Sequence, residues 1–310
     1  MFILGKGRSG STIINNILGQ VPGVFAAGEL LYLWDWGIRQ RIRCGCGADI
    51  LECPIWSQVL DEAFGITSRS RDGERIEAMH RDYYHVARWH HGPRLLTRRT
   101  VGRWPALQRY AESMAVLFRT IANVTGAQVV VDSSKKPINP AALGFVDGVD
   151  ATIVHLVRDP RAVCFSWQRS KPWTDRDEGG NTPQFGAIYT SASWAVRNIG
   201  TEVIARRWPR ESVTRLRYED FSREPRTVIR QLVDLVGLPT AELPFRDDNT
   251  VVLRPTHTIG GNPNRMTGGK VTITPDSEWA SKLDGRTARI ATILTRPLLR
   301  RYGYDTSGAG

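Results

Sequence analysis

The 310-residue chain has no long hydrophobic run. Its apolar stretches, such as Ala151–Val157, are far shorter than the roughly 20 residues that a membrane-spanning helix needs. Met1 leads directly into Phe2-Ile3-Leu4, with no basic leader, no hydrophobic core of a signal peptide and no cleavage site. We therefore expect neither a transmembrane segment nor a signal peptide, and a cytoplasmic location follows as the default expectation.

Cysteine is scarce, and the chain has only Cys44, Cys46, Cys53 and Cys164. The Cys44-Gly45-Cys46 sequence with Cys53 nearby suggests zinc. Structural zinc sites, however, usually combine two ligand pairs, and no second pair is present. A loop with buried or locally paired thiols is therefore preferred to a metal site. We predict no metal ligands and leave open whether these thiols are free or paired.

Acidic residues are fewer than basic ones. The chain has 31 Asp and Glu against 42 Lys and Arg, which gives a formal charge of +11. This balance favours an anionic partner. The charge is spread along the chain and no nucleic-acid recognition motif is visible, so we do not expect nucleic-acid binding. An arginine-rich surface, as a GC-rich genome produces, is the alternative explanation of the charge.

Several apolar segments are typical of buried strands and are separated by helical stretches. They are Phe2–Leu4, Val129–Val131, Ala151–Val157 and Val213–Tyr218. Such a pattern predicts an α/β fold, a P-loop-like parallel sheet flanked by helices, with a helical insertion or cap. We expect one domain, 1–310, with the insertion at about 66–125, a mobile loop at about 171–200 and a glycine-bearing loop at about 257–270.

A glycine-rich turn follows the first strand and leads into a helix. Gly5 and Gly10 have the spacing of a Walker A loop and Thr12 stands at its hydroxyl position, but Ser11 replaces the lysine. Backbone N–H groups, the helix N-terminus and Arg8 still suit an anion. No acidic residue follows Asp132 as in a Walker B strand. The loop therefore predicts a bound phosphate-like group that is not handled as a magnesium–nucleoside triphosphate.

Two motifs resemble the donor site of sulfotransferases that use 3′-phosphoadenosine 5′-phosphosulfate (PAPS). Arg8–Thr12 is similar to their 5′-phosphosulfate loop, and Val157–Arg161 with Ser166 is similar to their 3′-phosphate element. Asp132–Lys135, Arg217–Asp220 and His257–Arg265 also resemble family segments, the last being the loop that closes over the nucleotide. The resemblance is weak over the helical insertion. It implies a bacterial-type, soluble enzyme that moves a sulfuryl group from PAPS to a hydroxyl by in-line displacement, releasing adenosine 3′,5′-bisphosphate.

The resemblance and the chemistry together nominate site residues. The predicted cofactor-binding residues are Gly7, Arg8, Ser9, Gly10, Ser11, Thr12, Arg158, Ser166, Tyr218, Asn264 and Arg265. Sulfuryl transfer depends on positioning and electrostatic stabilisation, and Arg8 and Lys135 are the predicted catalytic cations. Glu29, placed by a strand after the first helix, is the predicted base, and several sulfotransferases carry a glutamate there. His257 is the alternative base, whereas His155 is expected to be a core residue.

Two other functions stay open on sequence grounds. One is a P-loop nucleotide kinase or NTPase with a degenerate Walker A loop, and the other is a non-catalytic nucleic-acid-binding protein. We expect no metal requirement, because no magnesium-binding set is visible. The acceptor, a small molecule, carbohydrate or lipid-linked compound, is expected to bind between the insertion and the 171–200 loop. The oligomeric state is not predicted.

Overall fold

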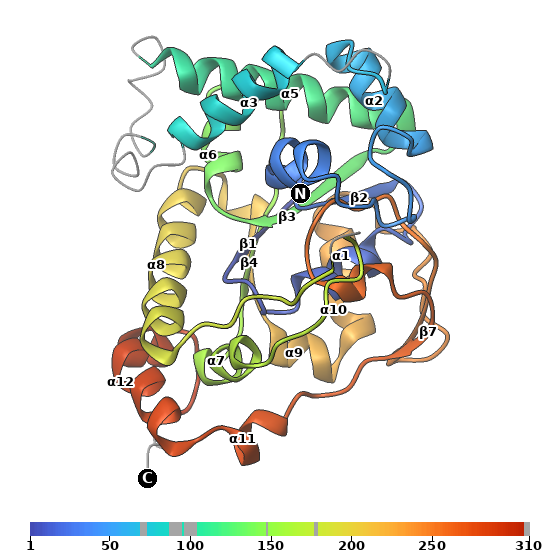
Figure 1. The fold of residues 1–310 in the computed structure, drawn as a ribbon. Coiled ribbons are helices and arrows are strands. Elements are labelled where there is room, and N and C mark those ends of the chain that lie inside the picture. Colours follow the sequence, from blue (N-terminus) through green and yellow to red (C-terminus); the bar gives the residue numbers. More distant parts are fainter. Residues whose placement is uncertain (69–72, 87–94, 96–103, 147, 177–178, 307–310) are drawn as a thin grey trace.

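A parallel sheet forms the centre of the fold in a computed structural model, which describes residues 1–68, 73–86, 95, 104–146, 148–176 and 179–306. Its five strands have the order β2-β3-β1-β4-β5, and all adjacent pairs are parallel (Figure 1). The strands are β1 (Phe2–Gly5), β2 (Val24–Gly28), β3 (Val129–Lys135), β4 (Ile153–Val157) and β5 (Val213–Arg217). The predicted α/β fold class is confirmed.

The central strands are buried on both faces, which explains their unbroken apolar sequences. Every residue of β1 and β4 is buried. Strand β3 is longer than Val129–Val131 predicted, because Asp132–Lys135 continue it to the edge where the polar residues gather. Parallel strands bring their carboxyl ends to one edge of the sheet, which is where ligands of open α/β sheets bind.

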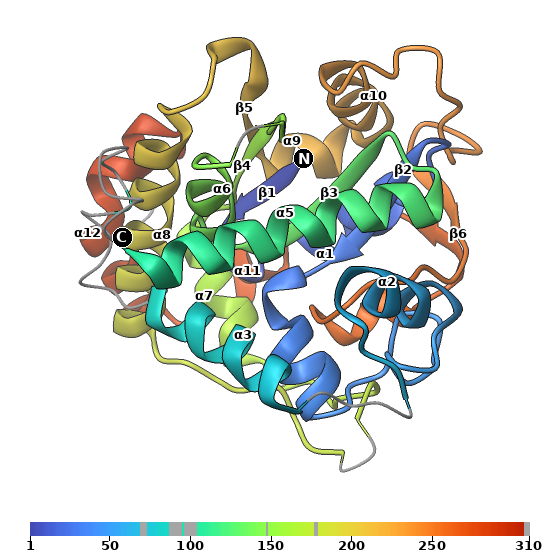
Figure 2. The same ribbon diagram turned by 90° about the horizontal axis from the view of Figure 1, so that it is seen from above.

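One face of the sheet is covered by the segment that the sequence suggested to be an insertion. Helix α5 (Pro105–Thr125) runs across this face (Figure 2), and the Phe118 ring meets the Phe2 ring of β1 edge-on at 5.5 Å. Its apolar residues recur at helical spacing and share the core with the sheet, so α5 is a layer of the fold rather than a cap above it. The other helices here are α2 (Pro54–Phe64), α3 (Gly73–Val86) and α6 (Ile138–Leu143).

A second core lies on the opposite face. Helices α1 (Ser11–Leu18) and α10 (Pro225–Leu235) pack there, with Ile14 and Ile229 both fully buried. Helix α9 (Tyr218–Arg223) precedes α10. An antiparallel hairpin of β6 (Thr250–Leu253) and β7 (Gly269–Thr272) completes this side, and the sequence analysis did not foresee it. The predicted 257–270 loop is largely the connection of this hairpin.

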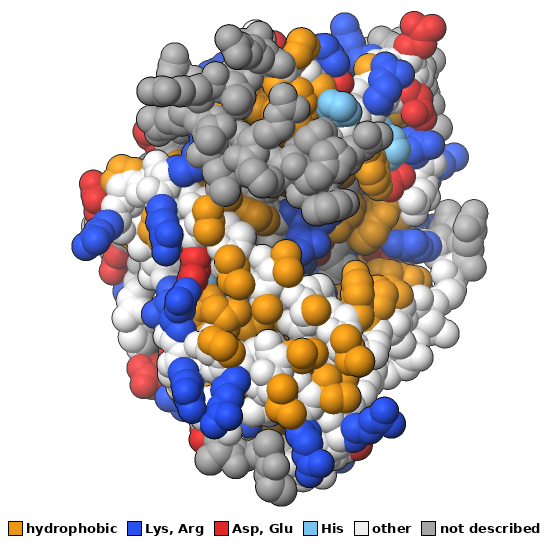
Figure 3. All heavy atoms as spheres, turned by 90° about the vertical axis from the view of Figure 1, so that its left-hand side faces the viewer, with side chains coloured by type: hydrophobic (Ala, Val, Ile, Leu, Met, Phe, Trp, Pro, Cys, Tyr) orange, Lys and Arg blue, Asp and Glu red, His pale blue; other side chains and the backbone are white. Residues whose placement is uncertain are grey.

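A third group of helices packs around α8 (Ala187–Ala205), which lies against β1 and β4. It also contains α7 (Pro160–Gln168), α11 (Glu278–Lys282) and α12 (Gly285–Arg301). The predicted mobile loop at 171–200 was wrong over 187–200, because Trp194 is fully buried there and makes α8 part of a core cluster. Side chains on the outer faces of α8 and α12 form an apolar area (Figure 3), which contains Ile188, Tyr189, Val196, Ile199, Ile293 and Leu294.

Short helical turns connect the larger elements. They are η1 (Leu30–Tyr32), the π-helical η2 (Leu33–Arg39), η5 (Arg210–Ser212) and η6 (Pro263–Met266). Over the described residues, no helix combines the length and the apolar composition needed to cross a bilayer.

Candidate functional site

A cavity of about 830 Å³ opens at the carboxyl edge of the sheet. The described residues that line it include nine Lys and Arg but only two acidic residues, Glu29 and Asp276. A volume of this size suits a ligand as large as a nucleotide, since ligand pockets measure roughly 300–1,000 Å³. The positive charge that is spread through the sequence is therefore concentrated, in part, around one cavity that suits an anion.

The glycine-rich turn between β1 and α1 lines this cavity. Gly10, the residue before α1, has φ +90°, and α1 has no side-chain hydrogen bond to cap its N-terminus. A Cβ on Gly10 would lie 2.2 Å from the Tyr218 ring, so only glycine fits. Ser11 and Thr12 also line the cavity. Unsatisfied N–H groups at a helix N-terminus form an anion site without any lysine.

The remaining loop residues differ in their placement. Gly7 and Arg8 line the cavity, and the Arg8 guanidinium stacks 4.9 Å from the Trp167 ring centre. Ser9, a predicted cofactor contact, is instead 1% exposed, and its hydroxyl has no hydrogen-bond partner. The structure does not place the Ser9 side chain on the cavity wall.

The predicted base and the second predicted cation lie side by side. Glu29 directly follows β2 and Lys135 ends β3, adjacent strands of the sheet. Their side chains form an ion pair and expose only 8% and 15% of their surface. The Glu29 N–H donates to the Ile259 carbonyl at 2.6 Å, and Lys135 adopts φ 66°. Backbone constraints therefore hold both groups at the cavity wall.

Arg158, Ser166 and Tyr218 line the same cavity, as their predicted shared role requires. The Arg158 guanidinium donates to the Arg8 carbonyl at 2.6 Å, forms an ion pair with Asp276 and lies 4.6 Å from the centre of the Tyr218 ring. Three segments far apart in sequence thus converge beside the glycine-rich turn.

Two residues of the segment His257–Arg265, which we call the late loop, do not face the cavity. The Arg265 guanidinium is buried against Asp175, at 2.7 Å, and donates to the Thr258 carbonyl at 3.0 Å. The prediction that Arg265 contacts the ligand therefore does not match its position, because the guanidinium is buried and both terminal nitrogens donate to other protein groups. His257 likewise directs Nδ1 toward Cys53 and Cys44 rather than the cavity. Asn264 does line the cavity.

Sequence reasoning missed two lysines. Lys6 precedes Gly7 in the loop, and its Nζ donates to Ser193 at 2.7 Å. Lys136 donates to the Tyr83 hydroxyl at 2.8 Å. Burial, followed by the nearby Arg197, lowers the pKa of each lysine to about 8. The position of Lys6 inside an anion-binding turn was the available signal for that residue.

The far end of the cavity is aromatic. The rings of Tyr32 and Trp36 stack at 3.9 Å, Trp173 meets Trp36 edge-on, and the Arg176 guanidinium lies 4.1 Å from the Trp173 ring centre. Described residues of the 171–200 segment therefore line the cavity, together with residues of η1 and η2. No described residue of 66–125 lines it, although Tyr83 reaches Lys136. Residues 89–91, part of the histidine and aromatic cluster in that region, lie outside the described residues.

Comparison with known proteins identifies the family. A family model described as "Sulfotransferase family" matches residues 57–242, more than half of the chain. The chain belongs to the sulfotransferase family. The match includes Lys135, Arg158, Ser166 and Tyr218, and it begins after the glycine-rich turn. No curated protein matches the chain.

Solved structures of sulfotransferases are among those similar to this chain. The sulfotransferase domain from the Synechococcus PCC 7002 olefin synthase is 21% identical, with 98% of this chain and 94% of that chain covered and a TM-score of 0.50. A sulfotransferase domain from the curacin biosynthetic pathway is 18% identical, with 98% and 97% covered and a TM-score of 0.49. The sulfotransferase of Alicyclobacillus acidocaldarius is 15% identical, with 99% and 97% covered and a TM-score of 0.42. The first of these supports a common sulfotransferase fold.

Proposed function

We propose that this sulfotransferase uses PAPS as donor and transfers its sulfuryl group to a hydroxyl of an organic acceptor. The observation that carries the proposal is the convergence of an uncapped helix N-terminus, Arg8 and Arg158 on one cationic cavity. PAPS is an anion at both ends, and this cavity offers cationic groups from two separate segments. The donor supplies the activated sulfuryl group, and the protein supplies charge and position.

The anion-binding elements fit the two ends of the donor. The α1 N-terminus and Arg8 suit the 5′-phosphosulfate, since backbone N–H groups and a guanidinium bind tetrahedral anions. Arg158 and Ser166 suit the 3′-phosphate, because a guanidinium and a hydroxyl donate complementary hydrogen bonds. Tyr218 lies between these groups, with its ring against Gly10 and Arg158. Lys135 provides a further cation for the bridging oxygen of the leaving group.

Glu29 is the proposed general base. Its carboxylate takes the proton of the acceptor hydroxyl as the new oxygen–sulfur bond forms and the bond from sulfur to the phosphate oxygen breaks. The products are a sulfate ester and adenosine 3′,5′-bisphosphate. Glu29 is preferred to His257, because the imidazole Nδ1 lies 3.2 Å from the Cys53 sulfur and the ring does not line the cavity.

The acceptor is proposed to bind at the aromatic end. Tyr32, Trp36 and Trp173 present ring faces and edges that suit a flat apolar or sugar-ring surface. This assignment includes small molecules, carbohydrates and lipid-linked compounds. It keeps the predicted segment after α7 in the acceptor site and replaces the 66–125 region by η1 and η2.

Ligand-induced thermal stabilisation tests the donor assignment. Adenosine 3′,5′-bisphosphate should raise the melting temperature without metal, and adenosine 5′-monophosphate should raise it less, because it lacks the 3′-phosphate. ATP with Mg²⁺ should stabilise least of the three. The reverse order would support the nucleotide-kinase alternative. Mass-spectrometric search for products that gain SO₃, in a metabolite extract incubated with PAPS, then identifies the acceptor.

Replacing the base tests the mechanism. Glu29→Gln keeps the side-chain volume and can still accept a hydrogen bond from Lys135, but it cannot take a proton. Turnover should fall roughly 10²- to 10⁴-fold, the usual contribution of a general base, while donor affinity stays within a few-fold. Glu62→Gln, an exposed change on α2, is the matched control. Equal turnover by Glu29→Gln and wild type would remove Glu29 from the mechanism.

A further inference from the structure

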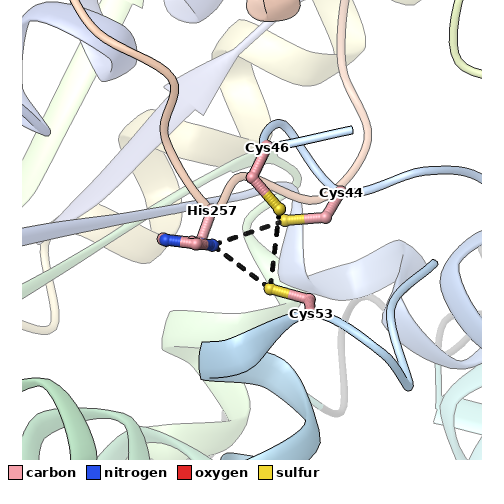
Figure 4. Close-up of side chains that lie close together, drawn as sticks. All are labelled: Cys44, Cys46, Cys53 and His257. Carbon is pink, nitrogen blue, oxygen red and sulfur yellow. Dashed lines mark hydrogen bonds between the residues drawn. The ribbon is translucent and has the colours of Figure 1, made fainter. Parts of the chain in front are cut away.

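A second cluster of reactive side chains lies outside the cavity. The ligand atoms of Cys44, Cys46, Cys53 and His257 all lie within 4.8 Å of one another (Figure 4). The three cysteines come from the loop before α2, whereas His257 follows β6, more than 200 residues later. The sequence disfavoured zinc because no second ligand pair is visible, and folding brings His257 to the three cysteines as a fourth ligand.

We propose that these four residues bind one zinc ion in a tetrahedral, structural Cys₃His site. The set consists only of sulfur and imidazole nitrogen, the ligands that zinc prefers in closed sites. Its composition does not suit magnesium or calcium, which prefer oxygen. The proposal is independent of the sulfotransferase mechanism, because none of the four residues lines the cavity.

The distances match the edges of a zinc tetrahedron. With zinc–sulfur bonds of about 2.3 Å and zinc–nitrogen bonds of about 2.0 Å, the edges are about 3.8 Å between sulfurs and about 3.5 Å between sulfur and nitrogen. The Cys46 and Cys53 sulfurs are 3.8 Å apart. His257 Nδ1 lies 3.2 Å from the Cys53 sulfur and 3.9 Å from the Cys44 sulfur. A disulfide would bring two sulfurs to about 2.05 Å, and all four cysteines are free.

The surroundings orient the ligands. The Trp56 indole donates to the His257 carbonyl at 2.6 Å, which fixes the backbone that carries the imidazole. Cys53 is the residue before α2. Cys44 and Cys53 are fully buried, while Cys46 is partly exposed.

A metal here would fasten the late loop to the active site. Gly45 donates to the Thr258 carbonyl at 2.9 Å, and a Cβ on Gly45 would lie 2.5 Å from the Thr256 carbonyl oxygen. The two segments therefore approach too closely for any other residue at position 45. Ile259, two residues after His257, pairs with Gly28 and accepts from the Glu29 N–H. The zinc would thus hold the backbone beside Glu29 without touching substrate.

Metal analysis of the purified, untagged protein is the decisive measurement. We expect about one zinc per chain by elemental mass spectrometry. Replacement by Co²⁺ should give thiolate charge-transfer absorption and the intense visible bands of a tetrahedral site. Under native conditions a thiol reagent should react faster once a chelator has removed the zinc. Metal-free protein that takes up neither ion, or a Cys46–Cys53 disulfide in the isolated protein, would overturn the proposal.

Matched variants assign the ion to these residues. Cys46→Ser changes the most exposed ligand and should reduce zinc content several-fold and lower the melting temperature. Cys164→Ser changes a buried thiol beside Ser191, outside the cluster, and should keep the full zinc content. Equal zinc loss in both variants, or none in Cys46→Ser and His257→Ala, would contradict the site. These readouts do not use activity, so they stand apart from the test of the proposed function.

Discussion

Replacing Gly10 by alanine tests whether the turn before α1 holds the donor anion. An ideal Cβ at this position lies 2.2 and 2.4 Å from two carbons of the Tyr218 ring, whereas ordinary contacts begin near 3.4 Å. The ring would have to retreat by more than 1 Å, and it is stacked against the Arg158 guanidinium. The variant therefore disturbs the turn and its aromatic neighbour together.

The expected loss of affinity follows from the backbone. Gly10 has φ +90°, and a residue with a Cβ in the left-handed region costs about 1–2 kcal/mol. The free loop can relax to another conformation, but binding the anion on the α1 N–H groups restores the strained one. Affinity for adenosine 3′,5′-bisphosphate should therefore fall about 5- to 30-fold, and further by the cost of moving the ring.

Isothermal titration calorimetry with adenosine 3′,5′-bisphosphate measures this loss, with the melting temperature recorded in parallel. Gly7→Ala is the control in the same turn, because its Cβ would meet only side-chain atoms, of Trp167 at 3.2 Å and of Lys135 at 3.9 Å. In a Tyr218→Ala background the clash disappears, so Gly10→Ala should then cost less. Wild-type affinity in a folded Gly10→Ala variant would refute the assignment of the turn to the donor.

Three further outcomes are expected. Asp276→Asn should tighten nucleotide binding a few-fold, because Asp276 forms an ion pair with the Arg158 guanidinium that we propose binds the 3′-phosphate. Weaker nucleotide binding by this variant in calorimetry would contradict the prediction. Nucleotide affinity should fall from pH 7 to pH 9, because the pKa values of Lys6 and Lys136 are lowered to about 8 and both side chains lose their charge above that pH. Lys6→Met should flatten the dependence of affinity on pH, and a wild-type affinity that does not change with pH would contradict the prediction. Adding Mg²⁺ to enzyme dialysed against metal-free buffer should not change turnover, as nine basic side chains already line the cavity; activity restored by Mg²⁺ but not by Zn²⁺ would refute this.

The sheet and its polar edge could be predicted because their signals are local. Strands such as Ile153–Val157 are continuous apolar runs, and residues just beyond them, such as Arg158, must lie at the same edge of a parallel sheet. Glu29 and Lys135 met for this reason. The net positive charge of the chain predicted an anionic ligand but did not indicate where that ligand binds.

The features that were missed depend on contacts distant in the sequence. Arg265 belongs to the segment His257–Arg265 that resembles the nucleotide-covering loop, but its guanidinium is buried in an ion pair with Asp175. His257 was the alternative base, while its actual neighbours, Cys44 and Cys53, lie more than 200 residues earlier. Periodicity carries no information on such pairings, and only the folded chain shows them.

Both acidic residues among the described residues that line the cavity form ion pairs with basic residues, which bears on the proposed mechanism. Glu29 pairs with Lys135, and Asp276 pairs with Arg158, so each carboxylate neutralises a cation assigned to one end of the donor. Each carboxylate offsets part of the desolvation cost of its cation, so the two ion pairs help to keep these basic groups in place. In the proposed mechanism, the donor anion would compete with both carboxylates. Attraction of Lys135 to the donor would free the Glu29 carboxylate to accept a hydrogen bond from the acceptor hydroxyl, so the proposed base would become available only where a sulfuryl group is ready to be transferred.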